Sequence, residues 1–182
     1  MRIVSIATAI GIAVSLGGTP LAAQSFSYGV GGGLTIPTGD FSDGFNTGWN
    51  LLAVLGYGRN AGLGFRGDFY YGQNGIKDPF DGHAKLAGGL ANVVYTFPGG
   101  RSTRPYVIGG VGVFNAKVNV SAGGLSGSDS ETKFAFGLGG GASFRAGRDS
   151  RVFAESRFIV VNTSDGSTNF IPLTVGISFG TK

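Results

Sequence analysis

The feature that most constrains this chain is a repeated alternation of apolar residues with small or polar residues. In its clearest stretch, Ile171, Leu173, Val175, Ile177 and Phe179 alternate with Pro172, Thr174, Gly176 and Ser178. Because successive side chains of a strand point to opposite faces, this stretch has one apolar wall and one small or polar wall. Eight such stretches predict an all-β fold, and they cover residues 25–36, 47–58, 62–72, 84–97, 104–115, 132–145, 151–162 and 169–179.

Glycine is unusually frequent, at 36 of 182 residues, and many glycines lie inside the alternating stretches. Interior glycine weakens an ordinary strand but relieves crowding where a small barrel bends tightly. In 84–97 and 104–115 both faces are apolar or glycine. The side-chain direction of these two strands therefore stays open.

The bulky residues of the predicted strands share one face, and small residues with a few charges share the other. An eight-stranded barrel has little room inside, so filling it with Phe, Tyr, Trp and Leu from every strand would overpack it. We therefore expect the bulky face to point outward into lipid, whereas a water-soluble barrel would have the opposite arrangement. The predicted fold is an eight-stranded antiparallel up-and-down transmembrane β-barrel.

Four charged residues belong to the small-residue face, and in a membrane barrel they have to point into the lumen because exposure to hydrocarbon is too costly. Arg66 and Asp68 lie at the same heights in 62–72 as Glu155 and Arg157 do in 151–162. At ~3.3 Å per residue, the pairs Arg66–Glu155 and Asp68–Arg157 should face each other across the lumen. We expect these pairs to fill the core structurally; the alternative is a gate or a narrow polar path.

The first residues resemble a secretory signal peptide. Arg2 is followed by an apolar run from Ile3 to Leu16, a Gly/Pro break and small residues before Gln24. The run is about 14 residues, shorter than the ~20 that a membrane-spanning helix needs. We expect a signal peptide over 1–23 and one barrel domain over 24–182. The chain has no cysteine, which excludes a disulfide framework.

The connections between the predicted strands alternate in length. Those after the first, third, fifth and seventh strands are about 10, 11, 16 and 6 residues, and the others about 3, 6 and 5, which matches the long extracellular loops and short periplasmic turns of outer-membrane barrels. Both termini are then periplasmic. The net charge of +4 divides between the ends, so it predicts no nucleic-acid patch. The short turns hold Arg59, Arg101, Arg104, Arg148 and Arg151, and the long loops hold Asp40, Asp43, Asp78, Asp81, Asp129, Glu131 and Asp165.

Three stretches carry a family resemblance: 104–113, which opens with Arg104, Pro105 and Tyr106, the glycine-rich run 136–144, and the closing strand 171–179. They resemble the OmpA/OmpX-type outer-membrane β-barrel domain over essentially the whole mature chain. The resemblance implies insertion by the outer-membrane assembly machinery, which commonly recognises a final aromatic residue. Here Phe179 is followed by three further residues.

Candidate catalytic and metal-binding residues are few. The single histidine, His83, has no serine placed beside it as a nucleophile, and Ser121, Ser126 and Ser128 lie in a Gly/Ser-rich segment. Asp78, Asp81, Asp129 and Glu131 lack the spacing of a calcium-binding loop. The glycine runs lack the Lys-Ser/Thr ending of a phosphate loop. We predict no enzyme, no cofactor and no metal.

We expect a monomeric outer-membrane protein with a packed, non-porin interior and a structural or surface-interaction role, in envelope integrity, adhesion or loop-mediated binding. The expected partners are outer-membrane lipids and lipopolysaccharide, the assembly machinery, and an extracellular ligand or host surface contacted by the loops 37–46, 73–83 and 116–131. The alternatives are a small channel for ions or apolar solutes and, third, a lipid A-modifying enzyme.

Overall fold

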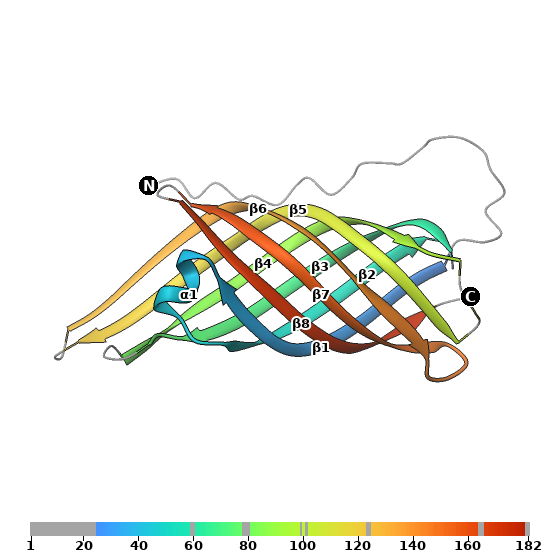
Figure 1. Ribbon diagram of the computed structural model, residues 1–182, viewed down its shortest axis with the longest axis horizontal. Helices are drawn as coiled ribbons and strands as arrows, with labels where there is room; N and C mark the ends of the chain where they lie inside the picture. The colour runs from blue at the N-terminus through green and yellow to red at the C-terminus, as the bar shows by residue number, and fades with distance from the viewer. Residues whose placement is uncertain are drawn as a thin grey trace, which may run out of the picture.

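Eight strands close into a barrel in the computed structural model, which describes residues 25–58, 61–77, 81–98, 100, 102–122, 125–163 and 166–180 (Figure 1). Each strand pairs antiparallel with the next along the chain, and β1 pairs with β8 to complete the ring. The predicted fold class is therefore confirmed. The strands are β1 (Ser25–Thr38), β2 (Gly48–Gly58), β3 (Gly62–Gly75), β4 (Asp81–Thr96), β5 (Thr103–Ala122), β6 (Leu125–Arg145), β7 (Ser150–Thr163) and β8 (Gly166–Gly180).

The two ends of the barrel differ. The turn end carries the connections 59–61, 97–102 and 146–149, together with the first and last described residues, Ser25 and Gly180. The hairpin end carries the connections 76–80, 123–124 and 164–165 and a short helix, α1 (Asp40–Gly44), whose Phe41 is buried. None of the helices in the described part of the chain is long and apolar enough to span a membrane.

The prediction of long loops is wrong at two of three places. β5 and β6 pair as far as Ala122 and Leu125, so most of 116–131 is strand, and most of 73–83 belongs to β3 and β4. Apolar alternation ends where the chain leaves the bilayer, but backbone hydrogen bonding between strands continues whatever the side chains are. The β5–β6 hairpin consequently projects well beyond its neighbours (Figure 1). Most of the third predicted loop, 37–46, is a connection: β1 ends at Thr38, and residues 39–47, which contain α1, lead to β2.

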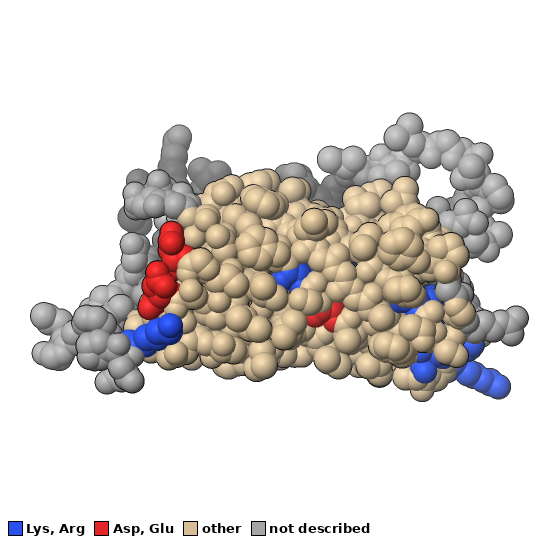
Figure 2. Space-filling view, in the orientation of Figure 1, with Lys and Arg blue, Asp and Glu red and all other residues tan. Residues whose placement is uncertain are grey.

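The predicted division of charge holds at the turn end only. Arg104, Arg148 and Arg151 lie there, whereas the hairpin end holds Asp40 and Asp43 of α1 together with lysines, so acidic and basic side chains are mixed at that end (Figure 2). The described lysines at the hairpin end are Lys77, Lys85, Lys117 and Lys133. Other predicted features lie outside the described residues: the signal peptide 1–23, Arg59, Arg101, Asp78 and Asp165, and the side chains of Asp81, Asp129, Glu131, Ser121, Ser126 and Ser128.

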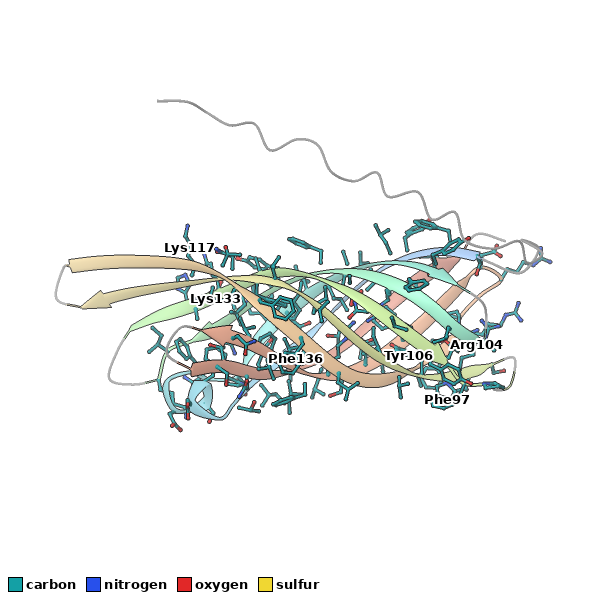
Figure 3. All side chains as sticks on the ribbon, turned by 90° about the horizontal axis from the view of Figure 1, so that it is seen from above. Phe97, Arg104, Tyr106, Lys117, Lys133 and Phe136 are labelled. Carbon is teal, nitrogen blue, oxygen red and sulfur yellow. The ribbon has the colours of Figure 1, made fainter. Side chains whose placement is uncertain are left out.

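Bulky apolar side chains cover the outer wall. Leu138, near the middle of β6, is 70 % exposed. Aromatic pairs lie toward both ends: Trp49 with Tyr71 at the hairpin end, and Tyr95 with Phe97, which Figure 3 labels, at the turn end. The facing that the sequence left open is now defined, since Leu90 of β4 and Ile108 of β5 point inward. Exposed apolar residues occur on all eight strands and include Phe26, Leu34, Leu51, Leu55, Phe65, Phe69, Val93, Val107, Val111, Phe134, Phe136, Phe158 and Val175.

The interior holds larger side chains than the expected glycine, hydroxyl and alanine lining. Tyr70, Phe114 and Phe170 are fully buried, with ring centroids 5.6 to 5.9 Å apart. Glycines on neighbouring strands make the space for these rings. A Cβ on Gly88 of β4 would lie 2.5 Å from Cγ of Phe114. Large inward residues therefore fit because glycine stands beside them in the next strand.

This close approach predicts that Gly88→Ala destabilises the barrel by about 1–3 kcal/mol, the usual cost of overpacking a core. The matched control is Gly89→Ala on the same strand, where the nearest atom to the new Cβ is a backbone oxygen at an ordinary 3.5 Å. Urea unfolding of both refolded variants measures the difference. Equal stabilities would contradict the proposed crowding at Phe114.

Candidate functional site

The lumen contains a ring of four charged residues from opposite walls of the barrel. Across the lumen, Nη2 of Arg66 lies 2.7 Å from Oε2 of Glu155, and Nη2 of Arg157 lies 2.5 Å from Oδ2 of Asp68. Along each strand, Arg66 also contacts Asp68 at 2.9 Å, and Arg157 contacts Glu155 at 2.5 Å. The structure thus brings all four residues together as a closed ring of alternating sign.

Little of this ring is open to solvent. The exposed fractions of the four side chains are 12 % for Arg66, 4 % for Arg157, 2 % for Glu155 and 0 % for Asp68. Buried charges are tolerated when each is paired and hydrogen-bonded, and guanidinium–carboxylate contacts do this well. Because the ring contains two acids and two bases, its formal charges sum to zero.

Two neutral residues complete the ring, and sequence analysis did not identify either. Nδ2 of Asn92 on β4 donates to Oδ2 of Asp68 at 2.9 Å and to the backbone oxygen of Arg66 at 3.0 Å. The hydroxyl of Tyr106 on β5 donates to Oε2 of Glu155 at 2.7 Å. Both residues belong to the strands whose facing was left open. The register between strands would have identified both. Asn92 pairs directly with Arg66, and Tyr106 pairs with Gly141, the partner of Glu155.

On the hairpin side of the ring the lumen is packed with apolar and hydroxyl groups. The hydroxyls of Tyr70 and Thr35 lie 2.5 Å apart, and Oγ1 of Thr174 donates to Oδ1 of Asn50 at 3.0 Å. A cavity of only about 10 Å³ lies between this layer and the ring. A space of that size is at the lower limit for one water molecule. The described interior is therefore closed from the ring toward the hairpin end.

His83, the histidine considered as a catalytic base, lies far from the charge ring. His83 lies on β4 opposite Gly75 and Asn119, roughly 30 Å along the strand from Asn92 at ~3.3 Å per residue. The ring itself offers two carboxylates, but each is held by both guanidiniums rather than aimed at an open space. Its geometry is suited to joining the two walls.

The comparisons with known proteins agree with this architecture. Residues 7–179 match the family model described as the outer membrane protein beta-barrel domain. This chain belongs to that family. The family is bacterial and resides in the outer membrane, so the exposed apolar wall of this outer-membrane barrel faces lipid. No curated protein matches the sequence.

Solved structures of similar fold are outer-membrane barrels of low sequence identity. Neisserial surface protein A is 20 % identical with a TM-score of 0.57, and the alignment covers 86 % of this chain and 96 % of that chain. Ail, the attachment invasion locus protein of Yersinia pestis, crystallised with the heparin analogue sucrose octasulfate, is 23 % identical with a TM-score of 0.52 over 87 % and 97 %. The N-terminal barrel domain of Pseudomonas aeruginosa OprF is 14 % identical with a TM-score of 0.52 over 86 % and 97 %.

Proposed function

We propose that this outer-membrane barrel is a structural and surface-interaction protein rather than a channel or an enzyme. The observation that carries the proposal is the closed lumen, in which the charge ring and the Tyr70, Phe114 and Phe170 layer occupy consecutive levels. A solute would have to displace both layers to pass through.

The projecting β5–β6 hairpin supports the surface role. It extends beyond the other strands at the hairpin end, where a cell-surface ligand would first meet the protein (Figure 1). We place this end outside a Gram-negative cell and the turn end in the periplasm, because outer-membrane barrels keep their tight turns and termini on the periplasmic side. The proposed partners are lipopolysaccharide around the wall and an extracellular or host ligand at the hairpin. Ail is named as an attachment protein, and attachment through a projecting hairpin fits the same arrangement.

Conductance in planar bilayers tests the closed lumen. The refolded full chain should produce no discrete current steps in molar KCl, while a large porin run in parallel should produce them. Regular steps from this chain would favour the small-channel alternative. Lipid A mass spectra from cells with and without the protein should be identical; a new or missing acyl chain would favour the enzyme alternative.

Shortening the hairpin tests the surface role. Replacing residues 117–130 with a two-residue Asn-Gly turn joins the register partners Ala116 and Glu131. This variant should still form a barrel that shifts in gel mobility on heating. Cells carrying this variant should lose binding to host cells or matrix by tenfold or more relative to cells carrying the full chain. Matched cells lacking the protein give the baseline. Full retention of binding by the shortened variant would overturn the hairpin assignment.

A further inference from the structure

A second space lies in the lumen on the other side of the charge ring. At the turn end the barrel holds a cavity of about 550 Å³ that opens at the rim and is lined by residues from all eight strands. Arg66 of the charge ring and Tyr106, which donates to Glu155 of that ring, lie at the inner end of the cavity. This cavity, which we call the vestibule, has the volume of a small-ligand pocket, typically ~300–1,000 Å³.

The charges that line the vestibule do not balance as those of the ring do. Its rim carries four arginines, Arg104, Arg145, Arg148 and Arg151, and one carboxylate, Asp149. Arg104 and Arg145 lie close enough to Arg151 for their charges to repel its guanidinium. Figure 2 shows several basic side chains at this end, and Figure 3 labels Arg104 there. A cavity mouth with this excess of positive charge attracts anions.

One of these arginines is held in place by the barrel. Arg151 donates from Nε to Oγ of Ser143 at 3.0 Å and from Nη2 to the backbone oxygens of Ser143 at 2.8 Å and Ser102 at 3.2 Å. These bonds use Nε and both hydrogens of Nη2, so Arg151 would contact an anion through Nη1. A guanidinium fixed by its neighbours loses less conformational freedom when an anion binds. The lining of the vestibule also offers hydroxyl groups from Ser27, Thr96 and Ser178.

We propose that the vestibule binds a small phosphate ester of about the size of a sugar phosphate. Arginine presents planar donor pairs that match phosphate oxygens, and several converging guanidiniums suit a dianion better than a single carboxylate. The serine and threonine hydroxyls then contact the polar remainder of the ligand. A free periplasmic phosphate ester and the headgroup of an anionic phospholipid share this chemistry. The site goes beyond the surface role and does not depend on it.

Calorimetry on the full chain folded in a non-ionic detergent tests the proposal with glycerol 3-phosphate, inorganic phosphate and glycerol as probes. Glycerol 3-phosphate should bind, inorganic phosphate should bind more weakly, and glycerol should not bind. The double substitution Arg104→Gln/Arg151→Gln should weaken glycerol 3-phosphate binding by tenfold or more. The matched control is Lys85→Gln/Lys117→Gln, which removes the same charge at the hairpin end, where these two lysines are direct cross-strand partners. It should change the affinity less than twofold.

A second variant distinguishes binding inside the vestibule from nonspecific attraction of anions to the arginines of the rim. Ser27→Phe fills the cavity and leaves every arginine in place, so it should abolish binding while the heat-dependent gel shift shows that the barrel is folded. Unchanged binding in Ser27→Phe, equal losses in both charge-removal pairs, or no heat with any phosphate probe would each overturn the proposal. Nanodiscs identify the source: competition by phosphatidylglycerol but not by phosphatidylcholine assigns a lipid headgroup, and no competition by either assigns a soluble ester.

Discussion

Glu155→Ala is expected to lower the free energy of unfolding by about 3–5 kcal/mol, the range measured when one partner of a buried ion pair is removed. In the intact ring, Glu155 contacts both Arg66 and Arg157 and accepts the hydroxyl hydrogen of Tyr106. Without it, two buried guanidiniums share the single carboxylate of Asp68. The measurement is urea unfolding in lipid vesicles, followed by the fluorescence of Trp49.

The double substitution Glu155→Ala/Arg66→Ala should be less destabilising than the single one. It leaves Arg157 and Asp68 as a neutral pair, with Asn92 still donating to Asp68. We expect a recovery of at least about 1 kcal/mol, within the ~0.5–3 kcal/mol that contacting residues show in double-mutant cycles. Additive losses from the two sites would mean that Arg66 and Glu155 do not stabilise each other.

Leu138→Arg is expected to lower the free energy of unfolding in a bilayer by about 2–4 kcal/mol, the cost of an arginine on the lipid face at mid-depth. Leu138 is the most exposed large hydrophobic residue among those that the structure describes, and it lies midway along the outward apolar residues of β6, between Phe134 and Phe144. The change inserts a charge where the outer wall contacts acyl chains.

Thr132→Arg provides the matched control for this depth effect. Thr132 is exposed on the same face of β6, toward the hairpin end and beyond Phe134, where the apolar wall stops. Substitution there should cost about 0–1 kcal/mol, as charged residues do near the interface. The same loss at both positions would contradict a lipid-facing wall centred on Leu138.

Much of the fold followed from side-chain alternation. The facing of β3 and β7 could be predicted because Arg66, Asp68, Glu155 and Arg157 cannot point into lipid, and that requirement also placed all four in the lumen. Strand ends at the hairpin end could not be predicted in the same way. There, β4 and β5 remain paired through polar residues such as Lys85 and its partner Lys117. The sequence of β4 in this part shows no apolar alternation.

The remaining contacts of the ring could not be read from the sequence, because they depend on register. Asn92 and Tyr106 lie in strands whose two faces are both apolar or glycine, so alternation gave no direction for either side chain. The aromatic side chains that point inward were not predicted for a related reason. The space for Phe114 comes from Gly88 on the adjacent strand, and that pairing appears only when β4 and β5 are aligned.

The order of charges in the ring also has a consequence for how the barrel is assembled. β3 and β7 are separated by three strands, so their cross-lumen contacts cannot form until the sheet curls and β1 meets β8. Until then, Arg66 still has Asp68 two residues away on its own strand, and Arg157 still has Glu155. Each strand therefore enters the membrane already neutral at this depth. We expect final closure to add a cross-lumen partner to each charge, which keeps its partner on its own strand.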